Sequence, residues 1–497
     1  MNQQVQRLVV VGGGSSGWMA ASLLKRLFGQ QLDVTLVESD DIATVGVGEA
    51  TIPPILFFNR ALGIDENAFL KATGGTFKLG IEFDGWFEPQ QAYMHAFGRL
   101  GKDMGLAGFH HTWLKARANG DARSFWDFSV NYQAAKQARY QPLSMLPNTN
   151  LPGLVHAYHF DAGLYAKYLR SLCEQWGVKR VEGRIEHVSL APQSGFIESV
   201  DLADGQRIQG DFFIDCSGFR ALLISEALKT GYEDWRHWLP CDRAVAVGCE
   251  ATEPRLPYTR SIAHEFGWQW RIPLQHRTGN GLVYSSEHCS EDDAAATLLA
   301  NLDGKALGEP RTIRFTTGRR QKQWYKNCLA LGLSSGFLEP LESTSLHMVQ
   351  SGLVRFIKLF PKHGINPETV DEYNRQSKVE FERIRDFIIL HYHLNARSEP
   401  FWQRCRNMPI PPELERRIAL FRQSGSVFRE QDELFTEVAW QQVMLGQGNI
   451  PEHYHPLADS LSDTQVNELL NNLQTLINGT VEGLQTHDSY LQQHCHR

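Results

Sequence analysis

The first part of the chain alternates between apolar runs and small residues in a way that predicts a strand, a turn and a helix. Leu8–Val11 is a continuous apolar run, as expected for a buried central strand of a parallel sheet. The glycine-rich residues 12–17 follow, and residues 18–24 have a helical pattern. A second apolar run, Val34–Val37, predicts the next strand. This order of elements is typical of a doubly wound α/β domain.

Later in the chain, shorter runs predict two more strands of the same sheet. Residues 210–216 and 328–333 are apolar and end in small residues, and residues 185–202 alternate like a hairpin. We expect residues 107–137 and 182–208 to be insertions of mixed loop and strand. From His347 onward the pattern becomes helical, most clearly at 351–359 and 379–390, with interruptions at Pro361, Pro400 and Pro411–Pro412.

The glycine-rich turn has the spacing of a dinucleotide-binding motif. Gly12, Gly14 and Gly17 form G-x-G-x-x-G between the first strand and the helix, which starts near Ser15. The first glycine permits a tight turn, the second a close approach of a pyrophosphate, and the third close helix–strand packing. Free N–H groups of the helix N-terminus would face the phosphate charge. Glu38 stands 21 residues after Gly17, where an acid binds a ribose hydroxyl, which favours FAD or NAD over NADP.

The separation of the remaining pieces favours FAD over NAD. A strand ending at Asp215 and a third strand leading through Leu333 to Gly336 would complete the cofactor site, with Ala50 beside it. NAD dehydrogenases usually keep these elements contiguous, whereas here more than a hundred residues separate them. We therefore predict an α/β fold. Its core is an FAD-binding, Rossmann-like domain of the p-hydroxybenzoate hydroxylase type, with an inserted sheet-rich substrate region and a helical C-terminal region.

Four segments resemble the flavin-dependent halogenases related to tryptophan halogenases. They are Gly267–Pro273 (GWQWRIP), Glu339–Thr344 (EPLEST), Gly46–Pro53 (GVGEATIP) and Tyr158–Ala162 (YHFDA). The resemblance implies an enzyme that uses reduced FAD, oxygen and chloride or bromide to make hypohalous acid. That acid would pass to a separate pocket and halogenate an aromatic carbon. A separate NAD(P)H-dependent flavin reductase would supply the reduced FAD.

The two tryptophans of the first segment have a physical interpretation of their own. Trp268 and Trp270 are two residues apart, so in an extended segment they point to the same side. Beside a flavin they would form a wall that keeps the organic substrate away from the ring. Such a wall argues against direct insertion of oxygen at the flavin. It favours an oxidant that diffuses or is relayed from the flavin to the substrate.

The resemblance also assigns the remaining catalytic and halide-binding positions. Lys78 matches the catalytic lysine, and Glu342 matches the second essential residue, which would stabilise the cationic intermediate and accept its proton, with Ser343 as its hydrogen-bonding partner. The backbone N–H groups of Thr344 and Ser345 would bind the halide. Ser345 stands where glycine is expected, so the choice between chloride and bromide stays open. We expect Glu339, the other acid of this segment, to cap a helix.

The sequence indicates the class of substrate less precisely than it indicates the cofactor. His95 and Phe97 resemble the H-x-F element whose rings hold the indole, and Trp440 matches the pocket tryptophan of the C-terminal segment. Val427-Phe428 replaces a tyrosine pair, and no Asn/Tyr-rich insertion follows Trp440, so the clamp for an amino-acid zwitterion is missing. We therefore expect an indole-like or other electron-rich aromatic, or a larger or peptide-borne indole, rather than free tryptophan.

Composition excludes several other classes. Among 497 residues, 42% are hydrophobic and 21% charged, and the net charge of −7 argues against nucleic-acid and anionic-membrane partners. The eight cysteines form no C-x-x-C pair, and no pattern predicts a metal site. No apolar run reaches the length of a membrane span, and no signal peptide is evident. We expect a cytoplasmic protein, for which a homodimer is one arrangement compatible with the sequence.

The predicted organisation divides the chain into six segments. The FAD-binding domain would comprise residues 1–90, 151–230 and 321–360, with a substrate-region insertion at 91–150, a sheet-rich insert at 231–320 and a helical substrate cap at 361–497. Two alternative functions stay open: a flavin-dependent monooxygenase that inserts oxygen, and a flavin-binding protein that has lost its chemistry.

Overall fold

A six-stranded sheet carries the predicted dinucleotide motif. The computed structural model describes residues 4–41 and 48–496, and this sheet has the order β20-β21-β12-β1-β2-β8. Neighbouring strands are parallel except for the pair β20 and β21. The strands are β1 (Arg7–Val11), β2 (Asp33–Glu38), β8 (Lys179–Glu182), β12 (Phe212–Asp215), β20 (Trp324–Tyr325) and β21 (Cys328–Ala330). The sheet is therefore assembled from segments far apart in the sequence.

The central strand β1 is buried on both faces, as its unbroken apolar run predicts. Leu8 and Val10 pack into the core beneath the helices, whereas Val9 and Val11 pack on the opposite face. The helices on the first face are α1 (Ser15–Phe28), α6 (Ala162–Gln175) and α8 (Ser345–Lys358). The opposite face is covered by a hairpin sheet of β9 (Ile185–Leu190), β10 (Ile197–Leu202) and β11 (Arg207–Gln209), and by the turn η4 (Leu222–Ala227). The predicted hairpin is confirmed.

One predicted strand is shorter than expected. The run 328–333 is a strand only as far as Ala330, because Gly332 has a φ of +62° and begins the 3-10 turn η5 (Gly332–Ser334). The chain then passes through β22 (Gly336–Phe337) and η6 (Pro340–Glu342) before α8 begins. This turn brings the EPLEST segment to the end of the sheet.

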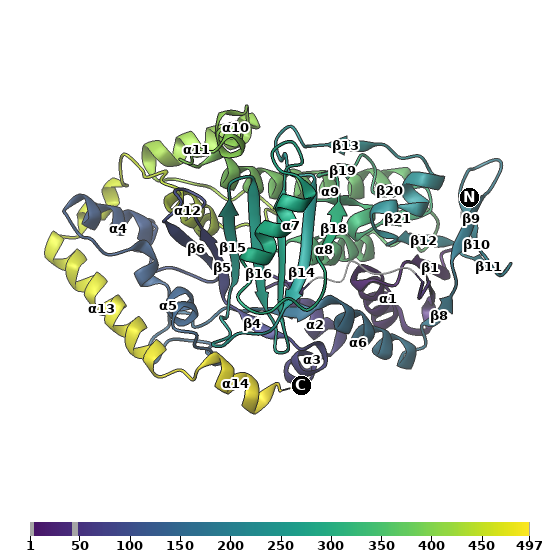
Figure 1. Ribbon diagram of the computed structural model, residues 1–497, viewed down its shortest axis with the longest axis horizontal. Helices are drawn as coiled ribbons and strands as arrows, with labels where there is room; N and C mark the ends of the chain where they lie inside the picture. The colour runs from purple at the N-terminus through teal and green to yellow at the C-terminus, as the bar shows by residue number, and fades with distance from the viewer. Residues whose placement is uncertain (1–3, 42–47, 497) are drawn as a thin grey trace.

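A second, seven-stranded sheet occupies the middle of the molecule (Figure 1). It is antiparallel apart from the pair β15 and β5, and it places the GWQWRIP segment on an inner strand. Its strands, in spatial order, are β18 (Arg311–Arg314), β14 (Arg243–Cys249), β17 (Thr278–Tyr284), β16 (Gly267–Pro273), β15 (Thr259–His264), β5 (Gly80–Asp84) and β6 (Ala92–Ala96). Helix α7 (Glu291–Ala300) packs on β14 and β17.

Two small sheets lie beside the large ones. One contains β3 (Gly48–Ala50), β7 (Ala157–Asp161) and β4 (Thr76–Lys78), and the other β13 (Tyr232–Asp234), β19 (Gly318–Arg320) and β22. Three shorter helical elements, η1 (Gly29–Gln31), α2 (Ile55–Leu62) and α3 (Glu66–Thr73), connect the N-terminal strands, and η3 (Gly218–Arg220) follows β12. Because β4 runs directly into β5, Lys78 stands where a small sheet meets the seven-stranded sheet.

The prediction of mixed loop and strand for residues 107–137 is wrong. This segment forms α4 (Phe109–Ala118), η2 (Phe125–Phe128) and α5 (Val130–Lys136). Ser124 and Ser129 each cap a following helical turn through the side-chain oxygen, which explains why short turns form in a segment without a long periodic pattern.

The C-terminal region is helical, as predicted. Prolines stand in the first position of three of its helices, where their missing N–H costs nothing. The elements are α9 (Pro367–His393), α10 (Pro400–Asn407), α11 (Pro412–Ser424), α12 (Glu437–Gly446), η7 (Pro456–Ser460), α13 (Asp463–Glu482) and α14 (His487–His494). In Figure 1, α13 and α14 run in yellow along one edge of the molecule, and α13 packs on α4 and α5.

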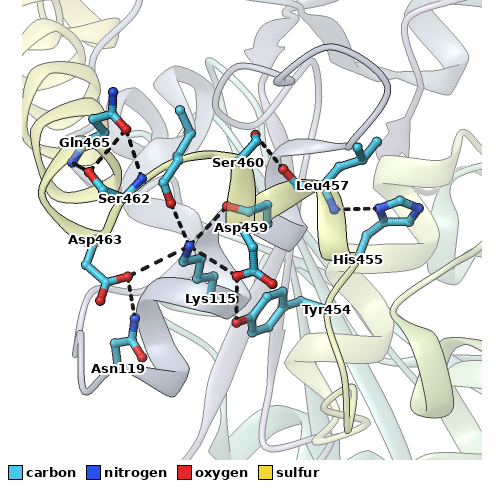
Figure 2. Close-up of polar contacts among 12 residues, drawn as sticks. Lys115, Asn119, Tyr454, His455, Leu457, Asp459, Ser460, Ser462, Asp463 and Gln465 are labelled. Atoms are coloured by element: carbon cyan, nitrogen blue, oxygen red, sulfur yellow. Dashed lines mark hydrogen bonds and ion pairs between the residues drawn. The ribbon is translucent and has the colours of Figure 1, made fainter.

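Lys115 connects several elements along this edge. Nζ of Lys115 on α4 donates to the carbonyl oxygens of Ala458 (3.2 Å) and Leu461 (2.7 Å) and lies 3.2 Å from a carboxylate oxygen of Asp459 (Figure 2). Asp463, at the start of α13, lies 3.8 Å away. The ammonium group thus satisfies carbonyl groups at the end of η7 and fixes this turn to α4.

Candidate active site

The glycine-rich turn after β1 forms where backbone segments approach too closely for side chains. A Cβ on Gly12 would lie 2.2 Å from the carbonyl oxygen of Cys216, and Gly12 has a φ of +109°. A Cβ on Gly17 would lie 1.8 Å from the carbonyl oxygen of Gly12, whereas one on Gly14 would meet nothing within 4 Å. Packing therefore requires Gly12 and Gly17, and Gly14 leaves the N-terminus of α1 open to a ligand.

This turn opens into a cleft of about 510 Å³ between the two large sheets. The cleft is lined by most of the predicted cofactor residues, namely Gly12, Gly14, Ser15, Glu38, Ala50, Leu333 and Gly336. Gly17 and Asp215 do not line it. The carboxylate of Asp215 is fully buried and accepts hydrogen bonds from the backbone N–H groups of Ser217, Leu223 and Ile224, so it fixes the turn after β12 rather than facing a ligand.

Glu38 is held at the end of β2 by two arginines. Oε1 lies 2.6 Å from Nε of Arg180 and 3.7 Å from a guanidinium nitrogen of Arg170. Oε2 reaches over the glycine turn, since a Cβ on Gly13 would lie only 1.4 Å from it. The cleft thus combines an open helix N-terminus with a fixed carboxylate, the two groups that bind the pyrophosphate and a ribose of a dinucleotide.

Trp268 and Trp270 form one wall of this cleft. Both lie on β16, both are buried, and both line the cavity, as their spacing of two residues predicts. Nε1 of Trp268 donates to Oε2 of Glu339 over 3.0 Å, and the hydroxyl of Tyr392 donates to the same oxygen over 2.5 Å. The expectation that Glu339 caps a helix is wrong: its side chain makes no capping bond at η6 and instead fixes the Trp268 indole.

Lys78 lies behind the cleft on β4. Its side chain is fully buried, and Nζ donates a hydrogen bond to Oγ of Ser343 over 2.8 Å. Burial lowers the pKa of the Lys78 ammonium to about 7, against the opposing effect of the Glu342 charge. Ser343 itself lines the cleft and has a φ of +57°, a strained value for a serine. Lys78 is therefore connected to the cleft through its hydrogen bond with Ser343.

Glu342 is fully buried between two histidines. Oε2 lies 2.8 Å from Nδ1 of His95, and Oε1 lies 2.9 Å from Nε2 of His391. Burial raises the pKa of Glu342, but the two histidines outweigh it and hold the pKa at about 2. Ser343 bonds to Lys78 and not to Glu342, so the partner predicted for Glu342 is wrong.

Comparison with known proteins identifies the family. Residues 7–463 match the family model described as tryptophan halogenase. The chain is 50% identical to Xcc4156, a flavin-dependent halogenase from Xanthomonas campestris, with a TM-score of 0.96 and 99% of both chains covered. It is 43% identical to BrvH, a flavin-dependent halogenase from Brevundimonas sp. BAL3, with a TM-score of 0.95 and 99% of both chains covered. It is also 35% identical to tryptophan 6-halogenase SttH from Streptomyces toxytricini, over 83% of each chain.

The chain belongs to the tryptophan halogenase family. The predicted resemblance, the FAD-binding fold class and the assignment as an FAD-dependent halogenase that needs a separate flavin reductase are confirmed. Of the GVGEATIP landmark, residues 46 and 47 lie outside the described residues, and Gly48–Ala50 form β3 at the cleft. Among the described residues, no helix of the halogenase is long and apolar enough to cross a membrane.

The predicted halide positions of the halogenase stand at the start of α8. Thr344 precedes the helix and Ser345 is its first residue, so their N–H groups lie at the positive end of the helix. Ser345 lines the cleft, whereas Thr344 is fully buried, and its hydroxyl has no hydrogen-bond partner among the described residues. The chemistry of this turn is suited to a small anion.

Aromatic rings surround His95 in the halogenase, and neither His95 nor these rings line the cleft. The ring centroid of His95 lies 6.3 Å from that of Phe97, 5.9 Å from that of Phe387 and 6.2 Å from that of Phe435. Phe435 stacks on Phe387 at 3.8 Å. Lys78 also borders this group, because its Nζ lies 5.5 Å from the centroid of the Phe97 ring. We call these four rings, together with Trp440, the aromatic pocket, because His95, Phe97 and Trp440 are the predicted substrate residues.

Trp440, the third predicted substrate residue, is the least exposed of the three. It packs against Phe387 at 4.8 Å, lies beneath the guanidinium of Arg417 at 4.2 Å and is almost completely buried. The sequence reasoning missed His391, Phe387 and Phe435. The first two are four residues apart on α9 and share one helix face, but nothing in the local pattern connects that face with Glu342.

Proposed function

We propose that this halogenase attaches chlorine or bromine to a carbon of an electron-rich, indole-like aromatic held in the aromatic pocket. The observation that carries this proposal is the position of Lys78. It contacts Ser343, which lines the cleft, and it borders Phe97 in the aromatic pocket. Reduced FAD, when bound in the cleft with Glu38 and the N-terminus of α1 as its ligands, supplies together with oxygen the oxidising power that converts halide into hypohalous acid.

Lys78 guides the halogen from the cleft to the arene. Its pKa of about 7 means that a large share of the amine is neutral near neutral pH. A neutral amine can form a haloamine, and its N–H groups can bind hypohalous acid and direct it to one carbon. Trp268 and Trp270 support separate sites for halide oxidation and for arene halogenation, because two buried indoles on the cleft wall exclude the organic substrate from the cleft.

Glu342 stabilises the cation that forms when the arene accepts the halogen. A buried carboxylate acts strongly on a positive charge because little water screens it. Thr344 and Ser345 bind the halide, and Ser345 in place of glycine leaves a choice between chloride and bromide. The expectation that free tryptophan is a poor substrate rests on the missing clamp around Val427, Phe428 and Trp440, and it stays part of this proposal.

Mass spectrometry of reaction mixtures tests the function. The protein is incubated with FAD, a flavin reductase, NADH, oxygen and either chloride or bromide, and with indole or tryptophan as substrate. A halogen isotope pattern on indole and its absence on tryptophan are the expected results. Halogenated tryptophan would refute the pocket argument, and a product heavier by one oxygen atom would support the monooxygenase instead.

A further inference from the structure

The carboxylate of Glu342 is closed off from the aromatic pocket by its own partners. Each of its oxygens contacts one imidazole nitrogen, at 2.8 Å for His95 and 2.9 Å for His391, and the side chain has no exposed surface. His95 keeps 9% of its side-chain surface accessible. An aromatic substrate in this pocket therefore meets the imidazole of His95 before it can meet the carboxylate.

His391 contacts the second oxygen of Glu342. Nδ1 of His391 lies 2.8 Å from the carbonyl oxygen of Phe387, and because a carbonyl only accepts, Nδ1 carries a hydrogen. Nε2 lies 2.9 Å from Oε1 of Glu342. His391 therefore packs against Oε1 as His95 does against Oε2, although the contact of His391 is not aligned as a hydrogen bond.

Glu342 also fixes the orientation of His95. Because a carboxylate accepts, Nδ1 of His95 donates to Oε2 of Glu342, which leaves Nε2 as the ring nitrogen outside this pair. Among the described residues, no hydrogen bond involves Nε2, and the rings around it are those of Phe97, Phe387 and Phe435. The other titratable groups that act on Glu342 are Lys78 and Tyr93. A free basic nitrogen among apolar rings is positioned to take a proton from a flat aromatic substrate.

We infer that His95 is the general base of the halogenation, and that Glu342 and His391 are the positioning residues that keep its ring oriented. The inference rests on the proposed function. Hypohalous acid delivers the halogen: the carbon–halogen bond forms with a π pair of the arene, and the halogen–oxygen bond breaks with its pair remaining on hydroxide. The electron pair of the C–H bond then returns to the ring, and the proton moves to Nε2 of His95. Its transfer to hydroxide yields water and restores the base.

The substitution His95→Phe tests the base while keeping an aromatic ring. We expect kcat for arene halogenation to fall by about 10²-fold or more, with FAD binding and hypohalous acid formation unchanged. Loss of the proton should then limit the rate, so a substrate deuterated at the halogenated carbon should react more slowly than the protiated one. The wild-type enzyme should show no such primary isotope effect, because attack on the ring limits its rate.

Phe435→Leu is the matched control, since it removes a neighbouring ring of the aromatic pocket without removing a base. It should raise KM without creating an isotope effect. His391→Gln tests the positioning: it removes the imidazole that packs against Oε1 of Glu342, so kcat should fall and an isotope effect should appear, with KM unchanged. Circular dichroism and FAD binding verify that each variant is folded.

These experiments distinguish a failure of the inference about His95 from a failure of the proposed function. A wild-type enzyme that halogenates the arene, together with a His95→Phe variant that does so without an isotope effect, would overturn the inference and leave the proposed function standing. The absence of an isotope effect in His391→Gln would overturn the role of His391. A wild-type enzyme that forms hypohalous acid but halogenates no arene would overturn the proposed function and this inference with it.

Discussion

Nζ of Lys78 and Oγ of Ser343 are joined by a hydrogen bond of 2.8 Å that links two segments 265 residues apart in the chain. Lys78 is on β4, whereas Ser343 lies between η6 and α8 with a left-handed backbone conformation. Ser343 faces the cleft, and Lys78 faces the aromatic pocket on the other side. The side chains of Ser343 and Lys78 therefore connect the cleft with the aromatic pocket.

Replacing Lys78 with methionine should remove arene halogenation while preserving the fold. Methionine has a similar length and no amine, and it avoids the burial of a charge. We expect a loss of about 10²- to 10⁴-fold in halogenation rate and unchanged FAD binding by fluorescence titration. Lys71→Met, on the exposed side of α3, is the control and should be fully active. Halogenation by Lys78→Met near the wild-type rate would refute the role of Lys78.

Replacing Glu342 with glutamine should separate the two halves of the reaction. The neutral amide cannot stabilise the cationic intermediate, but it leaves the cleft unchanged because Glu342 does not line it. We expect halogenated arene to form about 10²-fold more slowly and hypohalous acid, captured by a chemical trap, to form at the wild-type rate. Equal slowing of both steps would contradict the proposed role.

Gln442 fixes the backbone between His95 and Phe97 at the end of β6. Its amide oxygen accepts from the backbone N–H of Ala96, and its amide nitrogen donates to the carbonyl of the same residue, each over 3.0 Å. Ala96 stands between His95 and Phe97, so Gln442→Leu leaves two buried backbone groups unpaired. We expect a raised KM for the arene, with unchanged FAD affinity. Steady-state kinetics at varied arene concentration measure the effect, and an unchanged KM would show that β6 holds its position without Gln442.

Acidification should destabilise the enzyme through histidines that must stay neutral. Burial lowers the pKa of His110 and of His487 to about 4, compared with an ordinary value of 6.5. His487 donates from Nδ1 to the carbonyl oxygen of Arg255 and accepts the N–H of Phe77 at Nε2. In the unfolded chain these groups bind protons below pH 6.5, whereas in the folded enzyme they bind them only near pH 4. The stability they confer is therefore present above pH 6.5 and lost as the pH falls towards 4.

Urea unfolding at a series of pH values measures this effect. The free energy of unfolding should fall between pH 6.5 and pH 4, by at most about 3 kcal/mol for each of the two histidines. His487→Gln should reduce the slope of stability against pH, because glutamine can hydrogen-bond without titrating. A slope as steep as that of the wild type would show that His487 does not contribute.

Lys115→Met should loosen the C-terminal edge without touching the active site. The substitution leaves the carbonyl oxygens of Ala458 and Leu461 without their shared donor (Figure 2). We expect a loss of about 1–3 kcal/mol in the free energy of unfolding and retained halogenation at 25 °C. Lys167→Met, on an exposed position of α6, is the control and should change stability by less than about 0.5 kcal/mol. Equal stability of the two variants would contradict the anchoring role of Lys115.

The parts of the fold that were predicted correctly are those whose cause is local. The β1 strand and the glycine turn follow from a short apolar run and from residues that admit no Cβ. The Trp268 and Trp270 wall follows from the alternation of side chains along a strand. Within residues 107–137, which were predicted wrongly, the turn η2 and the helix α5 start at serine caps rather than in a long periodic pattern.

The sequence by itself determined the dinucleotide turn, the strand that carries the indole wall, the helical C-terminal region and the family. Only the tertiary structure decided that Glu339 holds Trp268, that Ser343 is the partner of Lys78, and that Glu342 lies between His95 and His391. The physical reason is the range of the interactions. Apolar periodicity and glycine geometry act between near neighbours in the chain, whereas a buried charge is compensated by whichever groups the packing of distant elements brings to it.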